Sequence, residues 1–177
     1  TPRHRRRYLD LALAQVQTQY SENLSEYESV LTQRNALLRQ LSENGGDHSQ
    51  LDFWDQRLAA RGAQVLAGRF RAIQELEQAA ARLHHDLTRG AEVLRLSYQP
   101  SYDPLPAPAG QRMLLDAPTD RSGISADKIE TGYLAALQKA HREDLARGTT
   151  SLGPHRDELR FLGNGIEETR GGTFDQI

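Results

Sequence analysis

The 177-residue sequence contains no cysteine, which excludes disulfide bonds and thiolate chemistry. It has no apolar run near the roughly 20 residues that a helix needs to cross a bilayer, and no signal sequence is visible. Hydrophobic residues make up only 37% of the chain, and the mean hydropathy is −0.68. We therefore expect a cytoplasmic protein without membrane contact, elongated in shape and with a thin core.

Excess charge of either sign is also scarce. The formal net charge of −2 excludes a global field that would draw the whole surface to nucleic acid. Charge is instead concentrated locally, in a basic cluster at the start of the chain that can clamp phosphates. Our candidate DNA-phosphate contacts are Arg3, Arg5, Arg6 and Arg7. The alternative interpretation of the same cluster is a solvated helix start.

The usual motifs for nucleotides and metals are missing as well. Neither G-x-x-x-x-G-K-[ST] nor G-x-G-x-x-G occurs, so no loop is available to cradle a triphosphate. His84 and His85 are consecutive and would point about 100° apart on a helix. His48, His141 and His155 lie in separate predicted elements, without an acidic partner at ligand spacing. We therefore predict no metal, no cofactor and no catalytic residue, and no enzymatic activity of this chain in isolation.

What the sequence does contain is a long helical pattern from Tyr20 to Leu87. Two segments meet at a break, Asn44-Gly45-Gly46-Asp47, and the first carries a heptad seam that Arg34 interrupts once. The seam residues are Tyr20, Leu24, Tyr27, Leu31, Leu38 and Leu41. The second segment carries two overlapping apolar stripes, Leu51–Ala72 and Leu66–Leu87, so we expect both of these faces of the later helix to be buried. A short break between two long amphipathic helices predicts an antiparallel hairpin about 30 to 50 Å long.

Shorter elements follow the hairpin. Alternating apolar residues predict a strand over Val93–Tyr98, and five of the seven prolines fall between Pro100 and Gly123, which predicts an irregular excursion. Ser125 is expected to cap a helix that ends at about Arg147. The tail Thr149–Arg170 is typical of a strand, a turn and a second strand, and such a hairpin needs the earlier strand as its partner.

These elements predict a mainly α fold, in which a long antiparallel, coiled-coil-like helical hairpin is joined by additional helices and a small antiparallel β-sheet or hairpin. We divide the chain into residues 1–98, with the basic helix, the hairpin and one strand, a proline-rich excursion over residues 99–123, and residues 124–177, with the capped helix and the β-hairpin. The last part is expected to pack back on the first as one elongated domain.

The most distinctive short run is Gly153-Pro154-His155-Arg156-Asp157-Glu158-Leu159. It is typical of a turn that enters an edge strand, because Pro154 removes a donor and His155 and Arg156 lie at the bend. An ordinary turn with exposed polar residues explains it most simply. Asp157 and Glu158 would face opposite sides of a strand, so they do not form a catalytic pair.

Three segments, in this order along the chain, resemble the RecF family of DNA replication and repair proteins. They are Arg5-Arg6-Arg7-Tyr8-Leu9-Asp10, then Tyr27-Glu28, Val30-Leu31 and Gln33-Arg34-Asn35-Ala36-Leu37-Leu38, and finally the run from Gly153 to Leu159 with Asn164-Gly165. The resemblance covers nearly the whole chain. Related RecN proteins share the last run, so only the first two segments distinguish a RecF-like chain from a RecN-like one. We interpret the chain as an interior fragment that covers the RecF helical arm.

The resemblance implies a longer protein with an ATP-binding-cassette-like head, related to the structural maintenance of chromosomes proteins, from which the arm protrudes. ATP and Mg would be cofactors of that longer protein. It would bind double-stranded and single-strand-gapped DNA as a homodimer and load recombinase with RecO and RecR. The family's nucleotide-binding segments lie before the match to Arg5 and after the match to Gly165, and the closing residues 171–177 depart from its pattern. The motif Gly153 to Asp157 receives no defined role from the resemblance.

Two alternatives stay open at this point. A free-standing coiled-coil scaffold would dimerise through an exposed seam and have no role with DNA. A RecN-like protein would carry a much longer coiled coil, and it is disfavoured because the whole excursion is complete within this chain.

Overall fold

The computed structural model describes residues 1–89, 94–105, 119–163 and 166–167. The helices in these ranges are α1 (Pro2–Val16), α2 (Thr18–Asn44), α3 (Gln50–Thr88) and α4 (Ala126–Arg147). The strands are β1 (Leu94–Gln99), β2 (Glu158–Gly163) and β3 (Ile166–Glu167), and a 3-10 turn η1 (Pro154–Arg156) precedes β2. The predicted mainly α class with a small antiparallel sheet is confirmed. Each helix within these ranges is too short or too polar to cross a membrane.

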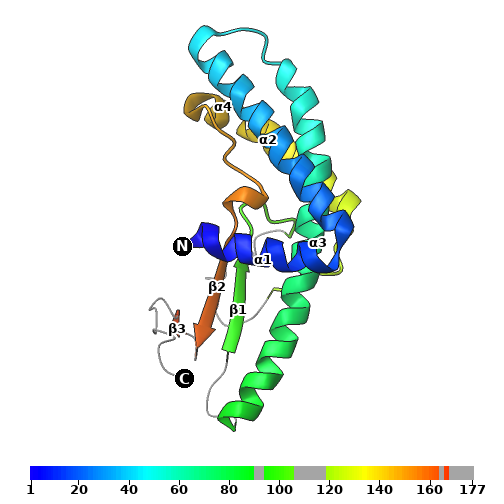
Figure 1. Cartoon of the computed structure of the whole chain (residues 1–177). Helices are drawn as coiled ribbons and strands as arrows, with labels where there is room; N and C mark the ends of the chain where they lie inside the picture. The colour runs from blue at the N-terminus through cyan, green and yellow to red at the C-terminus, as the bar shows by residue number, and fades with distance from the viewer. Residues whose placement is uncertain (90–93, 106–118, 164–165, 168–177) are drawn as a thin grey trace.

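The predicted hairpin is formed by α2 and α3, which run antiparallel and side by side (Figure 1). Helix α2 ends where Gly45 adopts a left-handed φ of 68° and donates its N–H to Leu41 O over 3.0 Å. Tyr20 and Tyr27 of the seam are buried against α3. A Cβ on Gly68 would lie only 2.8 Å from the Tyr20 ring, so this glycine permits the close approach of the two helices.

The second stripe of α3 is buried only in part. Leu66, Phe70 and Ile73 belong to the core, but Leu83 is 63% exposed and Leu87 is 74% exposed. The expectation that the whole stripe would be buried is therefore wrong for the last two turns of α3. The reason is that α3 is longer than its partner, and its C-terminal half continues past α2 beside the sheet (Figure 1).

Helix α4 packs against α3 and α2. Both predicted ends are confirmed: the Ser125 side chain accepts the Lys128 N–H, and Gly148 closes the helix with a φ of 61°. Tyr133 of α4 is fully buried, and a Cβ on Gly62 of α3 would lie 2.6 Å from its ring. The α3–α4 contact therefore depends on the absence of a side chain at residue 62.

The sheet has the order β1-β2-β3 and is antiparallel, with Tyr98 opposite Leu159. The predicted pairing of the early strand with the tail is thus confirmed. The segment before β2 contains η1, where the sequence predicts a turn that enters the strand. Side chains take its backbone N–H groups: Asn35 accepts the Thr150 N–H and Asp144 accepts the Ser151 N–H. Two predictions fall partly outside the described ranges. They are the turn between the two tail strands, at residues 164–165, and the proline-rich excursion, at residues 106–118.

Candidate functional site

A cleft of about 630 Å³ opens where α1 and α2 meet the η1 turn. Helix α1 contributes arginines and a strip of small and apolar side chains, α2 contributes two serines, and η1 closes one end with Pro154 and His155. The lining residues of α1 and α2 are Arg3, Arg6, Arg7, Asp10, Leu11, Ala14, Ser21, Leu24, Ser25, Tyr27 and Glu28. The fold therefore places the basic cluster and the Gly-Pro-His-Arg motif, which lie far apart in the sequence, at one site.

The four predicted phosphate contacts do not all face this cleft. Arg3, Arg6 and Arg7 line it, whereas Arg5 Nη2 lies 2.6 Å from Glu158 Oε1 at the start of β2. Arg6 also donates from Nη1 to the Asp157 carbonyl oxygen over 2.5 Å. In the described part of the chain, Arg3 and Arg7 are exposed and have no ion-pair partner. These two arginines are consequently the ones most open to an anion, and phosphate contact by the set stays a prediction.

The floor of the cleft is held by Arg69 of α3, which is only 2% exposed. Its Nε and Nη2 donate to the two oxygens of Asp10, each over 2.9 Å, and its Nη1 donates to Pro154 O over 2.7 Å. Two helices and the η1 turn are thereby tied to one guanidinium group. Because Arg69 balances the negative charge of the Asp10 carboxylate, Asp10 does not cancel the positive charge of the α1 arginines that line the cleft.

His155 of the motif is neutral at ordinary pH. Burial lowers its pKa to about 4, and the nearby Arg156, Arg6 and Arg69 act in the same direction. The ring lies 2.7 Å through Nδ1 from Tyr27 Oη and 3.1 Å through Nε2 from Thr150 O. Since a carbonyl can only accept, Nε2 carries the hydrogen and Tyr27 donates to Nδ1. His155 therefore fixes the cleft wall and adds no charge to it.

The rest of the motif is structural rather than an exposed turn. Gly153 has a φ of 127°, and a Cβ there would lie 2.0 Å from Tyr133 Oη, so only glycine fits. Asp157 is fully buried and accepts hydrogen bonds from Tyr98 and from the Ser101 N–H. Burial raises the pKa of Asp157, while Arg69 and these hydrogen bonds oppose the rise. Only Arg156 is exposed, so the expectation of an ordinary exposed turn is wrong.

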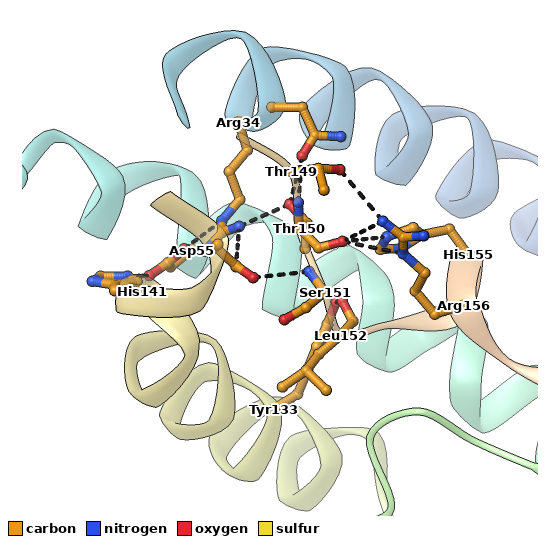
Figure 2. A network of polar contacts seen from close by, with 12 residues as sticks. Arg34, Asp55, Tyr133, His141, Thr149, Thr150, Ser151, Leu152, His155 and Arg156 are labelled. Carbon is orange, nitrogen blue, oxygen red and sulfur yellow. Dashed lines mark hydrogen bonds and ion pairs between the residues drawn. The ribbon is translucent and has the colours of Figure 1, made fainter. Parts of the chain in front are cut away.

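A second buried network surrounds Arg34, the residue that interrupts the seam (Figure 2). Its Nε lies 2.7 Å from Asp55 Oδ1 on α3, and its Nη1 lies 2.7 Å from Asp144 Oδ2 on α4. The same Nη1 donates to Thr150 Oγ1 over 2.8 Å. The sequence signal for this network was a charged residue at a seam position, where solvent is excluded. Arg69 is harder to recognise as a buried charge, because it lies between the two apolar stripes of the later helix, next to Gly68 and Phe70, and interrupts neither of them.

The Arg34 network also corrects the expectation for one histidine. His141 on α4 was predicted to lack an acidic partner, yet its Nε2 lies 2.5 Å from Asp55 Oδ2 on α3 (Figure 2). The partner is 86 residues away in the sequence, and only helix packing brings the two together. Spacing along the chain could not reveal it.

No protein-family model matches this chain. Its sequence is 35% identical over 165 residues to the DNA replication and repair protein RecF of Bacillus mycoides strain KBAB4, and 34% identical over 165 residues to that of a Bacillus cereus strain. Each alignment covers 93% of this chain and 40% of the relative. The chain thus spans about two fifths of the length of the curated relatives that it matches.

Solved structures agree with the sequence comparison. The fold matches a structure described as the recombination mediator protein RecF-ATPrS in the RecFOR pathway, with a TM-score of 0.77 and 26% identity. It also matches the corresponding RecF-ATP structure, with a TM-score of 0.76 and 23% identity. Both matches cover 94% of this chain and 40% of the other. In sequence and in fold, this chain is therefore similar to RecF proteins over about two fifths of their length.

Proposed function

We propose that this chain is the helical arm region of a RecF-type recombination-repair protein, and that the cleft between α1 and α2 contacts DNA phosphates. The observation that carries the DNA contact is the position of Arg3, Arg6 and Arg7 on one cleft, above a floor whose own charges are paired. Arginine suits phosphate recognition because its planar donors match phosphate oxygens.

The remaining parts of the proposal rest on the RecF relatives. ATP, which one of the two similar structures is described as containing, would be bound with Mg by the parts of a longer protein that lie outside the matched two fifths. RecO and RecR are the proposed partners, because both similar structures are described within the RecFOR pathway. Homodimerisation of that longer protein, loading of recombinase at single-strand gaps, and the packing of residues 1–98 and 124–177 as one elongated domain belong to the same proposal.

The burial of the helical seam favours this function over a free-standing scaffold. A scaffold that dimerises through its seam must leave that seam open to a second copy. Here Tyr20, Tyr27, Leu38 and Leu41 are each less than 5% exposed, since α3 already covers them. The arm is thus closed on itself as a hairpin, as a projection from a larger protein would be.

The DNA contact is tested by reversing the two open charges. The variant Arg3→Glu/Arg7→Glu is compared with wild type in fluorescence anisotropy with duplex and gapped oligonucleotides, at several salt concentrations. If each arginine neutralises one phosphate, the negative slope of log K against log salt becomes shallower by about 2 in the variant, at roughly 0.9 per lost contact.

A matched control is Arg71→Glu/Arg142→Glu, which changes the net charge equally at exposed positions of α3 and α4. Its slope should stay near that of wild type. An unchanged slope in the Arg3/Arg7 variant, or an equal decrease in the control, would remove the cleft from the DNA contact. Sedimentation of the chain with purified RecO or RecR tests the proposed partners separately.

A further inference from the structure

Three potential metal ligands from two helices meet at the α3–α4 contact. Two of them, Asp55 and His141, lie on the opposite side of Arg34 from the cleft motif (Figure 2). Asp52 and Asp55 are three residues apart on α3, so they share one face of that helix. His141 approaches this face from α4. One donor atom from each of these side chains lies within 4.8 Å of the other two.

With His141 counted as neutral, the charges around this cluster do not balance within the described residues. Arg34 is fully buried and contacts two fully buried carboxylates, Asp55 and Asp144. One positive and two negative charges leave a surplus of one negative charge, and the exposed carboxylate of Asp52 beside them makes it two. Buried charge without compensation is costly, so the site favours an additional positive charge. A divalent cation would supply it.

The donor set has the chemistry of a transition-metal site. Zn²⁺ binds imidazole nitrogen and carboxylate oxygen at about 2.0 to 2.2 Å, and ligands around such an ion lie about 3.3 Å apart. His141 Nε2 and Asp55 Oδ2 lie 2.5 Å apart, and a carboxylate oxygen of Asp52, one turn earlier on α3, lies within 4.8 Å of both, so the three donors bracket this spacing. A site built on two packed helices resembles the metal sites of helical bundles, whose ligands come from facing helices.

The outer shell that such a site needs is already in place. Asp55 uses Oδ1 to accept from Arg34 Nε, which leaves Oδ2 directed to His141. Arg34 is in turn fixed by Asp144 and Thr150. Groups that hold a ligating carboxylate in this way orient it and tune its affinity for the metal.

We propose that Asp52, Asp55 and His141 form a binding site for a divalent transition-metal ion, with Zn²⁺ as the preferred ion, which clamps α3 to α4. The site is structural: it lies in the arm, separate from the cleft, and does not depend on DNA binding. The competing account is that a proton on His141 balances the charge and that the histidine and Asp55 form a simple ion pair. The two accounts predict different responses to added metal.

The test is calorimetric titration of the metal-stripped chain with ZnCl₂, supported by the visible absorption of the Co²⁺ form. We expect one ion per chain, and a rise in the melting temperature on adding Zn²⁺. Asp52→Asn and His141→Gln should each weaken binding at least about tenfold, because loss of a ligand exceeds the 10- to 100-fold cost of losing an outer-shell group. His48→Gln, which changes an exposed loop histidine, should leave the affinity unchanged.

Asp55 is not varied, because its loss would also unpair Arg34. Asp52 is exposed and has no role in the Arg34 network, so Asp52→Asn reports on metal binding even if His141→Gln weakens the fold. Absence of saturable binding overturns the proposal in favour of the protonated histidine. Binding that persists undiminished in both Asp52→Asn and His141→Gln also overturns it, because the ion would then be held elsewhere. Neither outcome affects the DNA contact proposed for the cleft.

Discussion

Arg34 Nε donates to Asp55 Oδ1 over 2.7 Å, and both side chains are fully buried between α2 and α3. The residue that breaks the apolar seam is therefore the one that joins the hairpin most specifically. Through Asp144 and Thr150 the same guanidinium group also joins α4 and the segment after it. An apolar seam alone tolerates slippage by a heptad, whereas an ion pair inside it is satisfied in one register only.

Replacement of Arg34 by methionine should strongly destabilise the chain. The side chains are similar in length, so the loss of packing is small, but Asp55 and Asp144 would both remain buried without their cation. Breaking a buried ion pair by removing one partner costs about 3 to 5 kcal/mol. Urea denaturation followed by circular dichroism measures this loss. Arg71→Met, at an exposed position of α3, is the control and should change the unfolding free energy by less than about 0.5 kcal/mol.

A loss below about 1 kcal/mol for Arg34→Met would show that the two carboxylates find other partners or become protonated. In that case the network would not determine the register of the hairpin.

Gly153→Ala should destabilise the chain for two separable reasons. The residue has a φ of 127° and a ψ of 177°, a region that is essentially open only to glycine and costs other residues about 1 to 3 kcal/mol. In addition, its Cβ would lie 2.0 Å from Tyr133 Oη and 2.6 Å from Tyr27 Oη. We expect a total loss of about 2 to 4 kcal/mol in urea denaturation.

Tyr133→Phe separates these causes, because it removes the nearer hydroxyl oxygen. Gly153→Ala should cost less in the Tyr133→Phe background than in wild type, and the remaining cost reports the backbone strain together with the contact of the new Cβ with Tyr27 Oη. If the double-mutant cycle shows no coupling, the contact with Tyr133 does not contribute to the requirement for glycine.

The helical hairpin could be predicted from the sequence because its signal is local. Heptad spacing, the Gly45 break and the Ser125 cap all act within a few residues, and the structure confirms each of them. The pairing of β1 with β2 also followed, since a lone hairpin needs a partner sheet. The exposure of Leu83 could not be foreseen, because periodicity shows that a helix has an apolar face but not how long its partner is.

The buried polar networks, unlike the helical hairpin, could not be predicted from the sequence. Arg34, Asp55 and Asp144 meet from three helices, and the separation of Arg34 from Asp144 is 110 residues. No spacing rule links such residues, so in the sequence Arg34 is only an interruption of the apolar seam. Similarly, the basic cluster was found as a set, but only the fold shows that Arg5 faces Glu158 while Arg3 and Arg7 stay open.

Stability should decrease at mildly acidic pH because of His155. Its folded-state pKa of about 4 lies below the ordinary value of 6.5, so the unfolded chain binds the proton more tightly. The contribution is fully present above pH 6.5 and is lost as the pH falls from 6.5 towards 4. A shift of this size corresponds to about 3 kcal/mol.

The measurement is the unfolding free energy of wild type and His155→Gln between about pH 7.5 and 4.5, which spans most of that window. Groups common to both proteins, including Asp157 with its raised pKa, cancel in the difference. We expect the advantage of wild type over the variant to shrink as the pH falls. Parallel curves would mean that His155 is protonated as easily in the folded chain as in the unfolded one.

Variants at the exposed C-terminal end of α3 distinguish the proposed arm from the alternative of a self-associating scaffold. Leu83→Ala/Leu87→Ala should cost the isolated chain little, about 0.5 kcal/mol or less per residue, because both side chains are already mostly in solvent. Leu66→Ala, which empties a fully buried position of the same helix, should cost about 2 to 5 kcal/mol.

A chain that dimerised through the exposed Leu83 and Leu87 would behave differently: its melting temperature would rise with protein concentration, and the double variant would abolish that dependence. Sedimentation velocity over a roughly hundredfold concentration range, run on wild type and on the double variant, decides between the two. A monomer in both samples supports the arm, and a dimer in wild type alone supports the scaffold.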